Sequence, residues 1–311
     1  MSANSKRVIS LSSLPSGPNV VFHESSYFSR NRGQPFPTLS EIRTESAHQH
    51  SASYHDKTDP PPVLFESLGL LVKYGKGRVQ FAEGQCLWAL KHLVPEVPVP
   101  EIYGWTTEGD FVILYMELVK GVTVEKRWPS MTDEERARFW KGVRDVVDNL
   151  RKLSQEPNEH FIGQIDRGPI YDHALDNSHT PRLGPFANVE EFHDWLSMSI
   201  RIGAGVHWRA LKPEEHRDGY RHLVPDNAAI IFTHADLHPT NIMVDAENPS
   251  KIAAVIDWGQ SGWWPDYWEF YKAEWTSEIR SDWHQHLLKY LEEPDKVTLN
   301  AINDYVRALG N

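Results

Sequence analysis

One stretch decides the fold of this chain: Thr233-His234-Ala235-Asp236-Leu237-His238-Pro239-Thr240-Asn241, followed sixteen residues after Asn241 by Asp257-Trp258-Gly259. It sets an Asp and an Asn five residues apart and adds a second Asp downstream. A phosphoryl-transfer site needs one carboxylate that orients a hydroxyl nucleophile. It also needs an amide and a second carboxylate that hold Mg²⁺ on ATP phosphates. The pattern therefore predicts Asp236 opposite a substrate hydroxyl, with Asn241 and Asp257 as metal ligands.

The residues between the two metal ligands support this prediction. Segments 241–244 and 252–256 are apolar and short, and a turn containing Asn248-Pro249-Ser250 joins them. If they pair as a hairpin, Asp257 returns to Asn241 and both can bind one metal. Such oxygen ligands suit Mg²⁺, which takes the rest of its shell from water and phosphates. Either Asp alone would more often be a turn or cap residue, so the combined spacing carries the argument.

Composition limits the classes of protein that remain. The chain has 311 residues, 40% hydrophobic and 24% charged, which is typical of a globular protein of one large domain or two lobes. Its net charge of -11 argues against nucleic acid as a partner, because a phosphate backbone demands a basic surface. The single cysteine, Cys86, excludes an internal disulfide and favours a reducing compartment.

Hydropathy gives no sign of a membrane partner. No run of about 18 apolar residues occurs in the sequence. The first residues are rich in Ser, Asn, Pro and Gly, and serines interrupt their apolar positions, so they resemble neither a signal peptide nor an anchor. We therefore expect a cytoplasmic protein, and the sequence predicts no oligomeric state.

Secondary-structure patterns change along the chain. Strand-like segments cover 62–74, 97–105 and 110–118, with one helical segment at 81–92. Helical patterns follow: a capping box at Thr132–Glu135, a helix starting near Asn188, and helices from Trp268 onward with a break near Pro294. These patterns predict an α+β fold with a disordered tail (1–18), a strand-rich N-terminal lobe (19–119) and a larger helical C-terminal lobe (120–311).

The stretch from Val20 to Thr58 is polar and mixed, and no element is predicted there. Its three histidines, His48, His50 and His55, lack a second ligand cluster at metal-site spacing. We expect them to lie in a solvated loop.

The motif His234-Ala235-Asp236-Leu237-His238-Pro239-Thr240-Asn241, with Ile256-Asp257-Trp258, resembles the catalytic core of the protein-kinase-like superfamily. The sequence of this motif resembles the aminoglycoside phosphotransferase and choline kinase branch more than the protein kinases. Two flanking motifs, Pro265-Asp266-Tyr267-Trp268-Glu269 and Tyr115-Met116-Glu117-Leu118, are similar to those of fungal members of that family. The likeness covers roughly residues 60 to 280 and implies a two-lobed kinase-like fold.

The resemblance also implies roles for individual residues. Asp236 would be the catalytic base, and Asn241 and Asp257 the Mg²⁺ ligands. Lys73 corresponds to the family lysine that pairs with the α- and β-phosphates of ATP, and Glu83 to the glutamate that fixes that lysine. The backbone of Met116, Glu117 and Leu118 would form the hinge that meets adenine.

One feature of the family pattern is missing. No Gly-rich phosphate loop precedes Lys73, and Gly75-x-Gly77 follows it and is better interpreted as a turn. A pseudokinase-like protein, which binds a nucleotide or another ligand without transfer, is therefore an alternative to an ATP- and Mg²⁺-dependent small-molecule O-phosphotransferase.

The acceptor side is less defined by the sequence. Aromatic and acidic residues follow Asp257 closely, and four of them are candidate acceptor contacts: Trp263, Asp266, Tyr267 and Glu269. Aromatic faces beside carboxylates suit a cationic amine, and the family resemblance implies a small hydroxylated molecule. Core packing between helices is the alternative for these residues.

A metal-dependent hydrolase is the remote alternative. His234-x-Asp236-x-His238 could act as a ligand triplet on an extended segment. No second cluster completes such a site, because His284-x-His286 lies on a predicted helix, where positions i and i+2 diverge.

Overall fold

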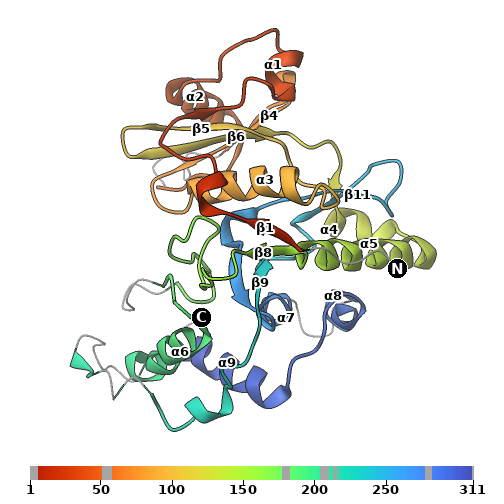
Figure 1. Cartoon of the computed structure of the whole chain (residues 1–311). Helices are drawn as coiled ribbons and strands as arrows, with labels where there is room; N and C mark the ends of the chain where they lie inside the picture. The colour runs from red at the N-terminus through yellow and green to blue at the C-terminus, as the bar shows by residue number, and fades with distance from the viewer. Residues whose placement is uncertain are drawn as a thin grey trace. The chain divides into compact units, whose positions relative to one another are not determined.

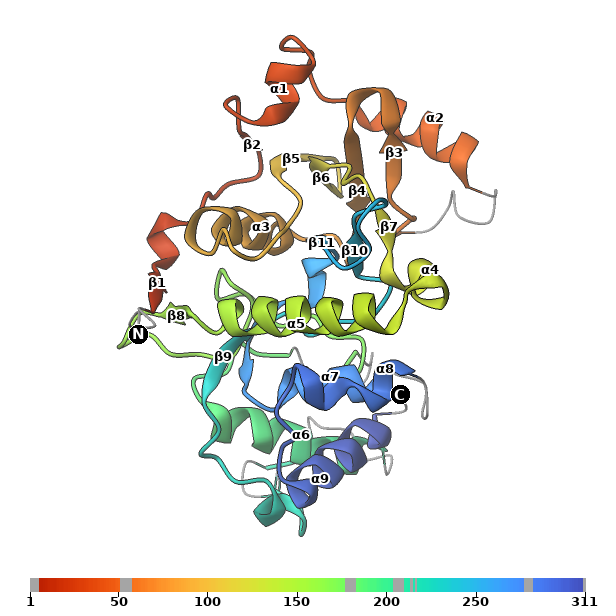
Figure 2. The ribbon, with the colours of Figure 1, turned by 90° about the vertical axis from the view of Figure 1, so that its right-hand side faces the viewer.

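The computed structural model (Figures 1 and 2) describes residues 6–50, 58–176, 183–203, 210–212, 215, 217–276 and 282–309. The chain forms two compact units. We call them the sheet unit, made of Ser12–Phe139 and Thr240–Gly259, and the helical unit, made of Met1–Leu11, Trp140–Pro239 and Gln260–Asn311. The α+β class predicted from the sequence is confirmed. The predicted lobe boundary at 119/120 falls inside the sheet unit, so the division into those two lobes stays a prediction.

The sheet unit is built on a five-stranded antiparallel sheet of order β2-β5-β6-β4-β3. Its strands are β2 (Val20–Val21), β3 (Val63–Phe65), β4 (Leu70–Gly75), β5 (Ile102–Glu108) and β6 (Phe111–Glu117). Helix α3 (Phe81–Leu93) packs against β5 and β6. The predicted helix and the predicted strands of 97–105 and 110–118 are confirmed, whereas the single strand expected over 62–74 is two strands, β3 and β4, separated by a 3₁₀ turn at Glu66–Leu68.

The two faces of this sheet have different coverings. Alternation along β4 puts Leu70, Val72 and Tyr74 into an apolar core with Tyr27 of α1 (Ser26–Arg30) and Ile42 of α2 (Leu39–Gln49). Figure 1 shows α1 and α2 on one side of the sheet and α3 on the other. Lys73, which stands between two core residues on β4, therefore belongs to the α3 side.

The expectation that 20–58 holds no element is wrong. Helix α2 begins with a capping box in which the Thr38 backbone N–H donates to the Glu41 carboxylate and the Glu41 N–H donates to the Thr38 hydroxyl. Its apolar stripe is only Leu39 and Ile42, too faint to predict a helix. His48 lies in α2 and His50 caps its end, whereas His55 lies outside the described residues.

A second, three-stranded sheet carries the predicted metal ligands. Strand β10 (Ile242–Val244) pairs antiparallel with β11 (Ile252–Val255) and with β7 (Val122–Thr123). The hairpin predicted around Asn248-Pro249-Ser250 is confirmed. Beyond its last pair, the Ile256 N–H donates to the Asn241 carbonyl at 2.8 Å, which brings the residue before Asp257 back to the start of the hairpin.

The predicted disordered tail is wrong for part of its length. Strand β1 (Arg7–Ile9) pairs in parallel with β8 (Leu153–Gln155), and Ile9 and Leu14 are buried. Backbone hydrogen bonds and two apolar side chains order this segment. A three-residue strand broken by serines is too short to show the alternation that predicts strands.

The described part of the helical unit holds two short strand pairs, the parallel pair β1–β8 and the antiparallel pair of β9 (Ile230–Thr233) and β12 (Gly262–Pro265). The predicted capping box begins α5, with N–H donations in both directions between Thr132 and Glu135. The helices beyond β7 are α4 (Val124–Arg127), α5 (Asp133–Leu150), α6 (Val189–Gly203), α7 (Trp268–Trp275), α8 (Asp282–Gln285) and α9 (Lys296–Ala308).

Short 3₁₀ turns complete the chain at Leu11–Ser13, Glu66–Leu68, Trp128–Ser130, Arg221–Leu223, Trp258–Gln260 and Leu287–Lys289. Strand β12 was not predicted, because all four of its residues are buried, so its sequence Gly-Trp-Trp-Pro does not alternate between apolar and polar side chains. Among the described residues, no helix is long and apolar enough to cross a membrane.

Candidate functional site

Lys73, Glu83 and Asp257 meet in the sheet unit. Lys73 leaves β4 on the α3 side, and Glu83 stands in the first turn of α3. The Lys73 Nζ donates to Glu83 Oε1 at 2.6 Å and to Asp257 Oδ1 at 2.7 Å. The structure thus brings together three residues that are 10 and 184 positions apart in the sequence. Figure 2 shows β4 and α3, which carry Lys73 and Glu83, and β11, which ends two residues before Asp257, in the sheet unit.

Burial is unequal across this cluster. The side chains of Lys73 and Glu83 are 16% and 4% exposed, whereas that of Asp257 is 53% exposed. Burial alone would lower the pKa of Lys73, but the charges of Glu83 and Asp257 outweigh it and raise that pKa above its ordinary value. Burial also raises the pKa of Glu83, and the Lys73 ammonium opposes that rise. The lysine therefore keeps its charge.

The turn after β11 holds Asp257 in an unusual backbone conformation. Asp257 has φ of 65°, in the left-handed region that non-glycine residues enter at a cost of roughly 1–3 kcal/mol. The neighbouring Trp258 is buried and donates its indole N–H to the Val255 carbonyl at 2.9 Å. This anchor sustains the strained turn, and the half-exposed carboxylate with the Asn241 amide on the same hairpin is an oxygen donor set that fits Mg²⁺.

The loop carrying Asp236 lies in the helical unit and is held through its backbone. The N–H groups of His234 and Ala235 donate to Glu269 Oε2 at 2.8 and 3.4 Å. The Asp236 N–H donates to His234 Nδ1 at 3.1 Å. Ala235, between them, has φ of 61°. Glu269 and His234 therefore fix the turn from which the Asp236 carboxylate extends.

The His234 geometry bears on the hydrolase alternative. Its Nδ1 accepts a backbone hydrogen bond and its side chain is fully buried. In the described part of the chain, no group of three or more His, Cys, Asp or Glu side chains is placed to hold a metal. The structure gives the ligand triplet no support.

Glu269 is a buried acid on α7. Burial raises its pKa to about 7; the two backbone N–H donors lower it, and the Asp236 charge raises it further. Arg151 is the cation that opposes the Asp236 effect. The group that holds the Asp236 loop therefore changes charge near neutral pH.

The predicted hinge is the end of β6. The Glu117 N–H donates to the Glu101 carbonyl at 2.8 Å, and the Leu118 N–H donates to the Gly69 carbonyl at 3.1 Å. Met116 is buried and pairs with both neighbouring strands. Two of the backbone donors expected to meet adenine are thus already engaged within the sheet unit, and the hinge role stays a prediction.

The Gly75-x-Gly77 segment is a turn, as predicted. The N–H groups of Gly77 and Arg78 donate to Asp59 Oδ1 at 3.2 and 2.8 Å. A Cβ on Gly75 would lie 2.3 Å from that same oxygen. A carboxylate of the chain itself occupies the donors that could otherwise cradle a phosphate. The sequence did not predict this role for Asp59, because nothing in its spacing links it to this turn.

Comparison with known proteins identifies the family. The profile of the phosphotransferase enzyme family (APH) matches residues 82–299, which is more than half of the chain. This chain belongs to that family. It is therefore a small-molecule phosphotransferase, and the matched region contains Glu83, Asp236, Asn241 and Asp257. Among curated proteins, none matches the chain.

Three solved structures resemble this phosphotransferase. They are gentamicin-bound APH(2")-IIa (15% identity, 76% of this chain and 74% of that chain, TM-score 0.47), aminoglycoside phosphotransferase APH(4)-Ia (14%, 78% and 76%, 0.46) and a Haemophilus somnus 129PT protein described as a fructosamine-3-kinase (14%, 76% and 73%, 0.45). At these identities and TM-scores, membership rests on the family profile. The likeness to fungal members stays a prediction.

In this phosphotransferase, the four candidate acceptor residues do not gather around Asp236. Trp263 is buried in β12, and Glu269 is buried beneath the Asp236 loop. The pairing of Gly262 with Thr233 and of Pro265 with Ile230 puts Asp266 and Tyr267 beyond the opposite end of the strand pair. Three residues of strand separate the two ends by about 10 Å. The acceptor role of the four residues stays a prediction, and their placement favours structural roles.

Tyr267 is held by a buried hydrogen-bond chain. His193, whose side chain is fully buried, lies 2.8 Å from Asp226 Oδ1 through Nδ1 and 2.7 Å from the Tyr267 hydroxyl through Nε2. Burial lowers the pKa of His193 to about 4, and the Asp226 contact opposes that shift. The His193 ring is therefore neutral, so Nδ1 can donate to Asp226 while Nε2 accepts a hydrogen bond from the Tyr267 hydroxyl.

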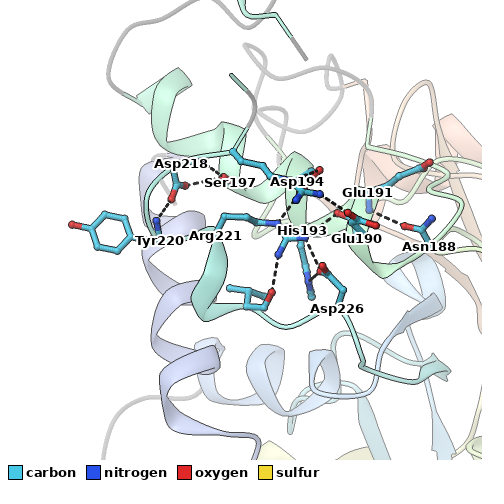
Figure 3. Close-up of polar contacts among 12 residues, drawn as sticks. Asn188, Glu190, Glu191, His193, Asp194, Ser197, Asp218, Tyr220, Arg221 and Asp226 are labelled. Atoms are coloured by element: carbon cyan, nitrogen blue, oxygen red, sulfur yellow. Dashed lines mark hydrogen bonds and ion pairs between the residues drawn. The ribbon is translucent and has the colours of Figure 1, made fainter. Parts of the chain in front are cut away.

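Figure 3 shows the network to which this chain belongs. Arg221 donates to Asp226 Oδ1 at 2.6 Å and to Asp194 Oδ1 at 2.7 Å, and Ser197 donates to Asp218 Oδ2 at 2.9 Å. These contacts tie the segment 217–226 to helix α6. They stabilise the helical unit, and sequence analysis missed them because they join residues that are 5 to 33 positions apart without a motif.

Proposed function

We propose that this chain is an ATP- and Mg²⁺-dependent O-phosphotransferase that acts on the hydroxyl of a small molecule. The observation that supports it best is the Lys73–Glu83–Asp257 cluster, in which a charged lysine bridges a buried and a half-exposed carboxylate. A bound Mg²⁺·ATP would supply the phosphoryl group and neutralise charge on it.

Each residue has a defined task in this proposal. Lys73, fixed by Glu83, would bind phosphate oxygens, and Asn241 with Asp257 would hold the metal. Asp236 would accept the proton of the acceptor hydroxyl while the acceptor oxygen forms a bond to phosphorus and the bond to the ADP oxygen breaks. The buried Cys86 is in keeping with the cytoplasmic location expected for such an enzyme.

The test is a phosphorylation screen over a metabolite library, detected by the mass gain of one phosphate. Wild type should form a product only with Mg²⁺ and ATP. Asp236→Ala and Asp257→Ala should each lower the rate by about 10²–10³-fold or more, whereas Asp304→Ala on the exposed face of α9 should not. Product formation that survives both substitutions would refute the proposal.

The same experiment separates the pseudokinase alternative. A protein that binds Mg²⁺·ATP, detected by a thermal shift, but forms no product with any library member would be a nucleotide-binding pseudokinase. The aromatic and acidic residues after Asp257 predicted a cationic acceptor, but their placement in the structure favours structural roles, so the charge of the acceptor is tested separately. Calorimetric titration with choline, hygromycin B and glucose tests this point, and binding of glucose alone would contradict a cationic acceptor.

A further inference from the structure

Loop 164–176 begins at the end of the β9–β12 strand pair from which the Asp236 loop also starts. Gly163 forms an antiparallel bridge with Trp263, with N–H···O distances of 3.2 and 2.8 Å. Because the bridge is antiparallel, the chain after Gly163 runs toward Gly262, and Gly262 pairs with Thr233. Thr233 is the last residue of β9 before the Asp236 loop. The register thus puts Gln164, the first residue of this loop, beside the start of the Asp236 loop, within the helical unit.

This close approach depends on glycine. A Cβ on Gly262 would lie 2.6 Å from the Gly163 carbonyl oxygen. That distance is too short for any side chain, so the two backbones meet only because position 262 has none.

A buried ion pair between Asp172 and Lys272 holds the second half of this loop against α7. Asp172 accepts hydrogen bonds from Lys272 Nζ at 2.8 Å and from the Trp268 indole N–H at 3.1 Å, both on α7. Lys272 also donates to Gln260 Oε1 at 3.1 Å, and the same oxygen accepts the His173 N–H at 2.9 Å. The pair therefore joins the loop to α7 and to Gln260, which stands three residues after Asp257.

The pair is fully sealed from water, because both side chains are 0% exposed. Buried ion pairs are weak sources of stability, since desolvation offsets most of the attraction, and apolar replacements of both partners are often as stable. A better account is that the pair fixes the position of a loop that must hold its shape.

The Asp172–Lys272 pair also fixes the positions of the two neighbouring residues in the loop, Tyr171 and His173. Tyr171 is half-buried and His173 is exposed. Their rings pack edge to face with centroids 5.1 Å apart, and the Tyr171 hydroxyl lies 3.3 Å from His173 Nδ1. We propose that loop 164–176 is the acceptor-recognition wall of this phosphotransferase, with Tyr171 and His173 as specificity-determining residues and Lys272 as the residue that positions them.

The chemistry of the pair indicates the acceptor class. An aromatic face beside a phenol and an imidazole offers stacking together with hydrogen-bond donors and acceptors. That combination recognises a hydroxylated ring. This inference rests on the proposed function and assigns recognition to Tyr171 and His173 in place of Asp266 and Tyr267.

The test uses the full chain with Mg²⁺·ATP and a defined mixture of amino-alcohols, sugars, polyols and aminocyclitols. Products are quantified by mass, and ATP hydrolysis without acceptor is measured in parallel. Tyr171→Ala and His173→Ala should each lower kcat/KM for the acceptor by roughly tenfold or more, with the KM for ATP and the acceptor-free hydrolysis unchanged. Tyr220→Ala, which removes a 63% exposed tyrosine of the same unit, is the matched control.

The double variant Lys272→Met with Asp172→Leu removes the ion pair without leaving a buried charge. It should fold, as circular dichroism and a cooperative melt would show, and should raise the KM for the acceptor while the KM for ATP stays the same. Wild-type kinetics in this variant, or an acceptor effect in Asp266→Ala that is absent from Tyr171→Ala, would overturn the inference. If wild type forms no product from the mixture, the proposed function fails and this inference fails with it.

Discussion

Two lysine–carboxylate clusters in this chain are built from similar parts but differ in contact with solvent. Lys73 bridges Glu83 and Asp257, and the Asp257 side chain is 53% exposed. Lys272 bridges Asp172 and Gln260, and neither charged side chain has any exposure. Their Nζ-to-carboxylate distances, 2.6 to 2.8 Å, are almost the same. Distance therefore does not distinguish the clusters, whereas exposure does.

Exposure determines what each cluster can do. A half-exposed carboxylate beside a lysine can exchange partners when a phosphate and a metal arrive, because water already reaches it. A sealed pair cannot exchange partners without opening the core, so its effect is to hold three segments in one arrangement. The first cluster is suited to binding, and the second to positioning.

The backbone around the two clusters follows the same division. Asp257 sits at φ of 65° in the first cluster, and no positive φ occurs at Asp172 or Lys272 in the second. Strained conformations gather where a side chain must be presented against local preference. A buried structural pair has no such need.

The largest expected effect is on the sealed cluster. Lys272→Met should lower the free energy of unfolding by about 3–5 kcal/mol, because it leaves the Asp172 charge buried and unpaired. Urea melts followed by circular dichroism measure this change. Lys296→Met, which removes a 79% exposed partner of Glu293, should shift the same quantity by less than about 1 kcal/mol. Equal shifts in the two variants would erase the distinction drawn between the clusters.

The open cluster should respond in activity instead. Lys73→Met should lower the phosphoryl-transfer rate by about 10²–10³-fold, the usual effect of removing one charge-stabilising group. Glu83, left without its lysine, should take up a proton, so the melting temperature falls only modestly. Lys76→Met, three residues along and paired with the exposed Asp110, is the matched control. A Lys73→Met enzyme with full activity would show that the cluster is structural too.

Sequence spacing predicted the hairpin that returns the chain before Asp257 to Asn241 and the proximity of Lys73 and Glu83. The Asp236–Asn241–Asp257 spacing and the hairpin between the last two depend on residues close in the chain, where turns and strand lengths constrain geometry. The Lys73–Glu83 contact could also be predicted, because the two residues lie only ten positions apart, at the end of a strand and the start of the next helix. The roles of these residues stay predictions that the variants above test.

The contacts that sequence could not supply are long-range and carry no motif. Asp172 and Lys272 stand 100 positions apart, and each alone has the pattern of an ordinary charged residue. Glu269 was grouped with the aromatic residues around it, since nothing in the sequence shows that its carboxylate turns toward the backbone of His234. Such pairings arise from how elements pack, which local periodicity does not encode.

The smallest expected effect is a pH dependence of stability that comes from Glu269 and distinguishes it from both lysine clusters. Its folded-state pKa is raised to about 7, with burial as the main cause. A raised pKa in an acid means that the folded state binds more protons than the unfolded state between the ordinary value and pH 7. The contribution of this group to stability is therefore fully present below about pH 4.5 and is lost as pH rises through 7, a loss of about 3 kcal/mol.

Glu269→Gln should remove this part of the pH dependence while an amide oxygen still accepts the His234 and Ala235 N–H groups. The measurement is the difference between wild-type and variant unfolding free energies from pH 4.5 to 8.5, which cancels groups common to both. Asp236 and Arg151 face Glu269, so the same curves in Arg151→Met show how far the neighbouring cation holds the pKa down. A flat difference curve would mean that Glu269 ionises at its ordinary pKa. The Asp236 loop would then be held with the same strength at every pH, as the sealed Lys272 cluster holds its own segments.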